Sequence, residues 1–183
     1  YLYQTVPDDT AVQRSRKELN DREHFSIQHS STWSESKSDQ QLLNQLKGSN
    51  EQNHWTRLNS PWMNDHYRLC ADHSSRWSKY QAEKIDDQRV GLGLEWNKQR
   101  KAASILLSNS VDDSRFGVEL DWTHALNDHW QYRLNFNTQA NIPLQAIRDG
   151  YEGESYLVGL NWQQNESRKA GWQYQLTDID DGN

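Results

Sequence analysis

This sequence has only one cysteine, no long apolar run and no excess of positive charge. Its single cysteine, Cys70, excludes an internal disulfide, and a free thiol counts weakly against export to an oxidising compartment. The longest apolar run lies within residues 102–107, far short of the roughly 18 residues of a membrane helix. Any membrane span must therefore be a β-strand. The net charge of −6, without a basic patch interleaved with aromatics, argues against a nucleic-acid partner.

Apolar residues are scarce as a class, but the aromatic ones are plentiful. The hydrophobic fraction is only 33%, below that of an ordinary soluble domain, yet the chain holds nine Trp, eight Tyr and three Phe. So many aromatics argue against disorder. The combination favours strands that bury one face only, as in a water-filled barrel whose outer face meets lipid.

The chain divides into a polar beginning and a long β-rich remainder. Residues 1–23 lack a period of two and are interpreted as a linker from an upstream domain, with a short helix possible over 11–20. Residues 34–53 are expected to form a loop because they are rich in Ser, Gln, Asn and Lys. Residues 24–183 are predicted to be part of an outer-membrane β-barrel, and we expect the chain to be a segment of a longer protein.

From Arg89 onward, apolar and polar residues alternate with the period of two that is typical of half-buried strands. A further apolar strand is expected at 101–109, with weaker ones near 24–33, 53–59 and 66–77. This predicts an all-β, antiparallel transmembrane barrel fragment with about eight or nine strands of bilayer-spanning length. The apolar positions of the five clearest strands are Val90, Leu92, Leu94 and Trp96; Phe116, Val118, Leu120 and Trp122; Trp130, Tyr132, Leu134 and Phe136; Tyr156, Val158, Leu160 and Trp162; and Ala170, Trp172, Tyr174 and Leu176.

The connections differ in length in the manner of outer-membrane barrels. Short turns are expected at 97–100, 125–128 and 164–167, and longer links at 110–114 and 138–153. Four tryptophans with apolar parity lie within a few residues of the short turns, and folding into hairpins would align them as a membrane girdle. They are Trp96, Trp122, Trp130 and Trp162. Phe116, Phe136, Tyr156 and Tyr174 are expected towards the opposite edge.

Several motifs from about residue 53 to the end of the sequence resemble the barrel domain of the PgaA-type porins, which export poly-β-1,6-N-acetylglucosamine. The Pro-Leu-x-Ala-x-Arg pattern at 143–148, followed by Asn-Trp-x-x-Asn-Glu-Ser-Arg at 161–168, is moderately specific. Less specific motifs are Ser60-Pro61-Trp62, Asp65-His66-Tyr67-Arg68-Leu69, Asn127-Asp128-His129-Trp130, Asn141-Ile142 and Asp181-Gly182-Asn183.

The resemblance implies a bacterial outer-membrane porin that passes a biofilm polysaccharide without catalysis or cofactor. In this family an upstream periplasmic helical-repeat domain recruits the partly de-N-acetylated polymer and its periplasmic deacetylase, and the barrel has about 16 strands. The partners implied are therefore the cationic polymer, outer-membrane lipid and, through the absent repeat domain, the deacetylase. Cys70 is unusual for such a protein.

Two sets of charged residues are candidates for contact with a polymer. The parity that faces the lumen contains four carboxylates that would attract a cationic chain: Asp72, Glu95, Glu119 and Asp121. The alternative is that these charges, with Arg68, Arg89 and Arg133, only solvate a porin interior. The long 138–153 link is stiffened by Pro143. Its charged residues, together with one just after it, could line or gate the exit, or they could belong to an exposed mobile loop: Arg148, Asp149, Glu152 and Glu154.

Two other functions compete with the porin. A soluble, Trp-rich β-sandwich could bind carbohydrate through exposed Trp. A barrel hydrolase could use Asp121 with His124, or Asp128 with His129, but no paired nucleophile accompanies either pair. The seven histidines form no metal signature, and phosphate-loop, CxxC and HExxH motifs are missing from the sequence.

Overall fold

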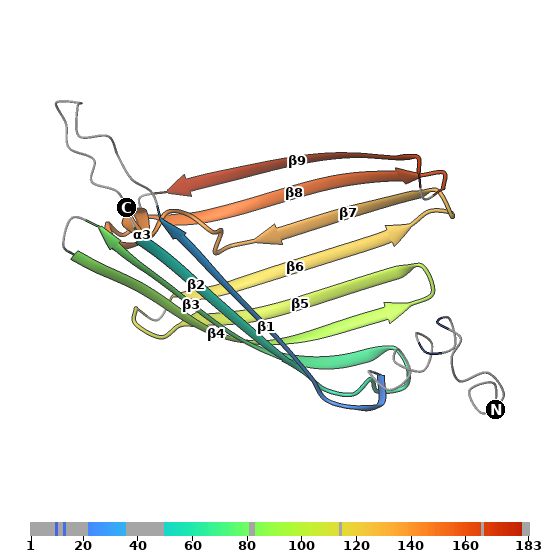
Figure 1. Ribbon diagram of the computed structural model, residues 1–183, viewed down its shortest axis with the longest axis horizontal. Helices are drawn as coiled ribbons and strands as arrows, with labels where there is room; N and C mark the ends of the chain where they lie inside the picture. Colours follow the sequence, from blue (N-terminus) through green and yellow to red (C-terminus); the bar gives the residue numbers. More distant parts are fainter. Residues whose placement is uncertain are drawn as a thin grey trace.

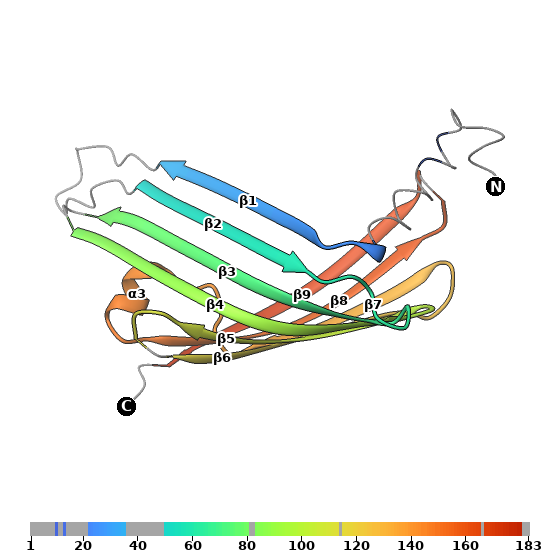
Figure 2. The same ribbon diagram turned by 90° about the horizontal axis from the view of Figure 1, so that it is seen from below.

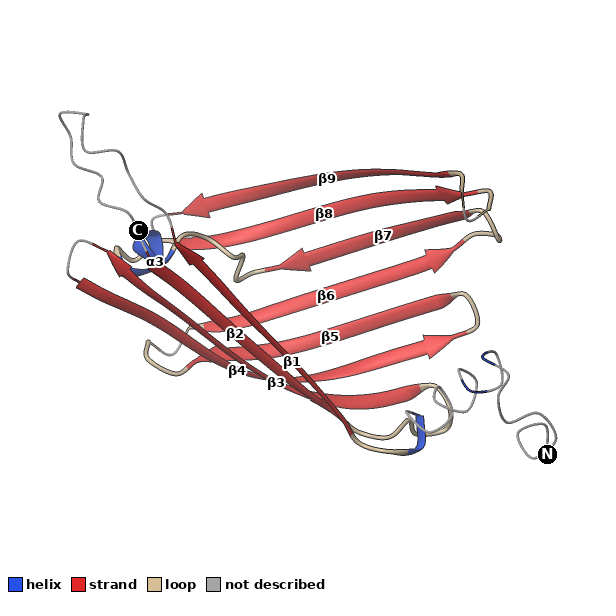
Figure 3. Cartoon of the chain, in the orientation of Figure 1, coloured by secondary structure: helices blue, strands red, loops and turns tan. Residues whose placement is uncertain are grey.

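The computed structural model describes Thr10, Gln13 and residues 22–35, 50–80, 83–113, 115–165 and 167–180. These residues form one nine-stranded antiparallel sheet in which each strand pairs with the next along the chain (Figures 1 and 3). The strands are β1 (Ser26–Glu35), β2 (Asn50–Asn59), β3 (Tyr67–Tyr80), β4 (Glu83–Lys98), β5 (Lys101–Ser110), β6 (Phe116–Ala125), β7 (Trp130–Asn137), β8 (Glu152–Gln163) and β9 (Lys169–Asp180). The all-β, antiparallel fold and the strand count are confirmed.

The predicted linker over residues 1–23 falls mostly outside the described residues, as does the centre of the expected 34–53 loop. The loop's two ends are corrected. Residues 34–35 belong to β1 and residues 50–53 to β2, where backbone pairing such as Thr32 with Asn53 continues through polar side chains. Likewise, β4 begins at Glu83, six residues before the alternation becomes apolar. Strand pairing by tertiary contact overrides the weak local preference of these polar residues.

Alternate side chains give the sheet two different faces. On the outer face, cross-strand neighbours form apolar rows such as Leu69, Leu94, Ile105 and Leu120, and these side chains are exposed in this sheet. The inner face carries mostly polar and charged residues. A β-sandwich needs a second sheet to cover such an apolar face, and the described part of the chain contains a single sheet. The single sheet therefore argues against the alternative of a β-sandwich and agrees with the predicted barrel fragment.

The sheet curves into a trough, and the short helix α3 (Leu144–Arg148) lies inside it (Figure 2). The tight turns joining β4 to β5, β6 to β7 and β8 to β9 lie together at one end, and β1 starts at this end too (Figure 1). The connection between β7 and β8 lies at the other end. Because outer-membrane barrels keep their short turns on the periplasmic side, we assign this end of the sheet to the periplasm.

The connection between β7 and β8 folds back over the sheet. Pro143 precedes α3, and its carbonyl accepts hydrogen bonds from the backbone N–H groups of Ala146 and Ile147. Gly150 follows the helix with a φ of 86°, the left-handed conformation that ends helices most readily at glycine. Proline before the helix and glycine after it fix a compact turn that stays close to the strands.

Among the described residues, α3 is the one named helix. No helix in this part of the chain is long and apolar enough to cross a membrane.

Candidate functional site

A cluster of paired charges occupies the inner face of β2, β3 and β4. The Arg57 guanidinium donates to both carboxylate oxygens of Asp72 at 2.7 Å and to Glu95 at 3.0 Å. Arg68 donates to the second oxygen of Glu95 at 2.6 Å. Arg57 and Glu95 come from β2 and β4, so the cluster links three strands through side chains that are mostly buried.

The two other predicted lumen carboxylates lie further along the same face, on β6. Asp121 accepts from Arg133 at 2.7 Å, and the Asn135 amide donates to both Glu119 and Asp121. Asp72, Glu95, Glu119 and Asp121 therefore share one face, but they form two groups. Three of the four pair with arginine, while Glu119 contacts an amide.

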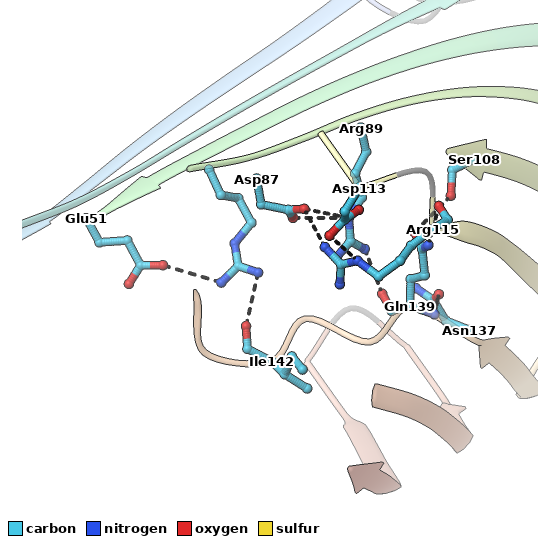
Figure 4. A network of polar contacts seen from close by, with 10 residues as sticks. Glu51, Asp87, Arg89, Ser108, Asp113, Arg115, Asn137, Gln139 and Ile142 are labelled. Atoms are coloured by element: carbon cyan, nitrogen blue, oxygen red, sulfur yellow. Dashed lines mark hydrogen bonds and ion pairs between the residues drawn. The ribbon is translucent and has the colours of Figure 1, made fainter. Parts of the chain in front are cut away.

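The connection between β7 and β8 is fixed to this inner face by a second arginine cluster (Figure 4). Arg76 donates to the carbonyl of Ile142 at 3.1 Å, and Arg89 to that of Gln139 at 3.2 Å. Asp87 is almost fully buried and holds Arg89 at 3.1 Å and Arg115 at 3.3 Å. Charged groups buried to this degree are stable only when paired, so the cluster fixes the position of the loop.

The same connection also carries the apolar core found among the described residues. Ile142, Leu144 and Ile147 pack with Ala140 against Ile85 of β4. Gly153 leaves space for this packing, because a Cβ there would lie 2.5 Å from Cγ2 of Ile142. The segment is therefore packed into the trough and narrows it.

Two adjoining hollows remain on the inner face beside these clusters. One, of about 410 Å³, is lined by residues that include Trp55, Asp72 and Arg76. The other, of about 330 Å³, lies towards the tight turns and is lined by residues that include Trp62 and Glu95. Arg57 and Glu119 line both hollows, so the two are continuous along the wall.

The comparisons with known proteins agree with this architecture. The family model described as "PgaA membrane beta barrel domain" matches residues 31–183. The chain belongs to the PgaA membrane beta barrel family. It is part of a β-barrel of the bacterial outer membrane, and the predicted resemblance and localisation are confirmed.

Individual relatives extend this family assignment. The poly-beta-1,6-N-acetyl-D-glucosamine export proteins of Escherichia coli strain K12 and of Escherichia coli O157:H7 are each 34% identical over 58 residues, which is 31% of this chain and 7% of either relative. A solved bacterial polysaccharide outer membrane secretin has a TM-score of 0.64 at 19% identity, and the match covers 88% of this chain and 53% of that one. This chain therefore matches only a small part of the curated relatives' length, and the solved structure supports the fold.

Within this PgaA-family sheet, the four predicted girdle tryptophans all lie on the outer face. Trp96 and Trp122 both neighbour Ala103, whose small side chain lets their rings stack with centroids 6.1 Å apart. Trp130 pairs directly with Trp162, with centroids 6.4 Å apart. Each lies close to a tight turn.

The predicted loop residues separate into two places. Arg148 ends α3 and Asp149 follows it, and the two side chains pair with each other at 2.9 Å. The assignment of Glu152 and Glu154 to the loop is corrected, because β8 already begins at Glu152. Both side chains lie on the outward face of that strand. Glu154 there accepts a hydrogen bond from the Tyr156 hydroxyl at 2.9 Å.

The candidate Asp–His pairs do not come together. Asp121 points to the inner face, whereas His124 contacts the Tyr132 hydroxyl on the outer one. Asp128 pairs with Arg100, and the His129 ring contacts the carbonyl of Gln163. The described residues also contain no cluster of three or more groups suited to a metal ion. These positions give no support to the alternative of a barrel hydrolase.

Sequence reasoning missed several arginines of the site and its most buried acid. Arg57, Arg76 and Arg115 were not singled out, nor was Asp87. Asp87 has the same parity as Arg89, so extending the β4 alternation by two residues would have placed it inside. Arg57 has no such signal, because apolar residues do not alternate along β2.

Proposed function

We propose that this chain forms one side of an outer-membrane conduit that exports partly de-N-acetylated poly-β-1,6-N-acetylglucosamine to the biofilm matrix. The observation that carries the proposal is the inner face, where carboxylates and arginines line two continuous hollows beneath a fixed loop. The two curated relatives are named poly-beta-1,6-N-acetyl-D-glucosamine export proteins, which supports this choice of polymer. Transport is passive, and no catalytic group takes part.

The carboxylates supply the attraction for a cationic polymer. A free glucosamine amine is positively charged, so it can take the place of an arginine beside Asp72, Glu95 or Asp121. Among the described residues, Glu119 is held by the Asn135 amide and pairs with no arginine, so its charge is the least compensated of the four and is free to pair with an ammonium group. Most of these acids are already paired with arginine, so the inner face has no strong net negative potential. The polymer's ammonium groups instead replace an arginine at individual carboxylates.

The segment between β7 and β8 narrows the outer mouth, with Arg148 and Asp149 at its exposed end. In the intact protein, outer-membrane lipid surrounds the outer face, and a periplasmic deacetylase acts with an upstream repeat domain. These partners complete the path: deacetylation creates the amines, and the conduit then accepts them.

The test is current recording from the intact protein in planar bilayers. Soluble β-1,6-linked glucosamine oligomers added on the periplasmic side should block the current, and fully acetylated oligomers of equal length should block it more weakly. An uncharged dextran of similar size is the control. Equal blockade by all three, or none by the glucosamine oligomer, would contradict the proposal.

Glu119→Gln should weaken the glucosamine blockade while leaving the dextran result unchanged. The loss should be about two- to tenfold in blocker affinity, because a hydrogen bond in a solvated site contributes about 0.5–1.5 kcal/mol net. Asp128→Asn, which changes an acid at an exposed turn, is the matched control. An unchanged affinity in Glu119→Gln would remove this residue from the binding path.

A further inference from the structure

The tryptophans of this sheet are divided unequally between its two faces. By strand alternation and pairing, seven of the nine lie on the outer face: Trp33, Trp77, Trp96, Trp122, Trp130, Trp162 and Trp172. Trp55 is opposite Ser74 and has the inner parity of Arg57 and Asp72. Trp62, in the connection between β2 and β3, also lies on the inner side, because its ring contacts Arg68.

These two inner rings cannot serve the membrane interface. Each lines one of the two hollows, Trp55 the one towards the loop and Trp62 the one towards the tight turns. Both are half-buried, so part of each ring surface stays open to the hollow. Aromatic side chains that line a hollow are the usual apolar contact surface of a ligand site.

Paired charges connect the two rings. The Arg57 guanidinium lies 5.2 Å from the centre of the Trp55 ring, and that of Arg68 lies 4.8 Å from the centre of the Trp62 ring. Glu95 joins the two arginines, and Arg22 lies over Trp62 as well, at 5.8 Å. The wall therefore alternates flat π surfaces with hydrogen-bonding groups from the tight turns to mid-strand.

This alternation matches the surface of a β-linked aminosugar. Its ring substituents are equatorial, so its axial C–H groups form a flat, positively polarised face that stacks on an aromatic ring. Its hydroxyl and amine groups extend around the rim, where carboxylates and guanidinium groups can bond them. Two separated stacking positions also give the weak, repeated binding that conduction requires.

We propose that Trp62 and Trp55 are successive stacking sites for the sugar rings of the exported polymer, with Trp62 met first on the periplasmic side. This inference rests on the proposed function and specifies how the conduit holds its substrate. Arg57, Glu95 and Arg68 position the sugar between the two rings.

The experiment measures how long single glucosamine oligomers block the current of the intact protein in planar bilayers. Trp55→Leu and Trp62→Leu keep apolar volume but remove the ring, and each should shorten the blockade by at least about threefold. Trp55→Phe and Trp62→Phe should retain most of it. Trp33→Leu, on the outer face of β1, is the matched control and should match the unaltered protein.

Retention of the heat-modifiable band on a gel shows that each variant is folded. Where a Leu variant does not assemble, the Phe variant at that position still tests the stacking site, because it should keep most of the blockade time. Blockade times that do not change in the Leu variants, or that fall equally in the Phe and Leu variants, would overturn the stacking sites while the porin stands. Failure of the oligomer to block the unaltered protein would instead overturn the proposed function.

Discussion

Arg57 is the residue on which the charge cluster of the inner face depends. It makes two hydrogen bonds to Asp72 and one to Glu95, so Arg57→Gln would leave two largely buried carboxylates with Arg68 as their remaining cation. We expect a loss of about 1–3 kcal/mol in the free energy of unfolding and a pore with a higher permeability ratio of cations to anions. Denaturant unfolding and reversal potentials measure the two effects.

Arg100→Gln is the control for this substitution. Arg100 pairs with Asp128 at an exposed turn, where an ion pair contributes only about 0–1 kcal/mol. It should change neither stability nor ion selectivity appreciably. If Arg57→Gln behaved in the same way, the cluster would have no structural or electrostatic role in the pore.

The residues of the site could be predicted only in part from the sequence. The parity of a strand indicates which side chains share a face, so Glu95, Glu119 and Asp121 were found by counting. Parity does not indicate which strand supplies a partner several dozen positions away, so Arg57 was missed. Trp55 was missed for a related reason: tryptophan near lipid-facing strands suggests a girdle, and only the register of β2 against β3 shows that it faces inward.

The position of the connection between β7 and β8 depends on the lack of a side chain at Gly153. In Gly153→Ala the new methyl would lie 2.5 Å from Cγ2 of Ile142, inside the apolar packing of the segment. Overpacking of this kind costs about 1–3 kcal/mol. The segment should shift away from β8 and further into the pore, and single-channel conductance should fall.

Gly159→Ala is the matched control, since Gly159 lies on the same face of the same strand. A Cβ there would have its nearest neighbour at 3.8 Å, an ordinary contact. Its conductance should equal that of the unaltered protein. Equal conductance in both variants would mean that the segment does not limit the pore.

Strands were predictable where outward positions are apolar and obscure where they are polar. From Arg89 onward the outward residues meet lipid and alternate clearly. At the loop ends of β1 and β2, beside and beyond Trp33, the outward face instead carries the polar residues Glu35, Asn50 and Gln52. Both faces of these strands are therefore polar there, which removes the period of two and explains why their ends were assigned to a loop.

The molecule as a whole is a curved sheet with two free edges in its described part, β1 and β9. Unpaired backbone groups are not tolerated within lipid, so further strands must close the barrel. The match to just over half of a solved outer-membrane protein agrees with this expectation. A closed barrel would turn the inner face into a lumen wall and leave the outer apolar rows as the only surface facing lipid.

This arrangement predicts how each tryptophan responds to lipids that carry bromine at a known depth. In variants of the intact protein that keep a single tryptophan, Trp130 or Trp162 should be quenched most by bromine near the head groups, because both lie beside tight turns on the outer face. Trp55 should resist quenching at every depth, since its ring faces the inner hollow. Quenching of Trp55 equal to that of Trp130 would mean that the two faces are assigned the wrong way round. If bromine near the bilayer centre quenched Trp130 most, Trp130 would not lie at the membrane interface, although the assignment of the two faces would still hold.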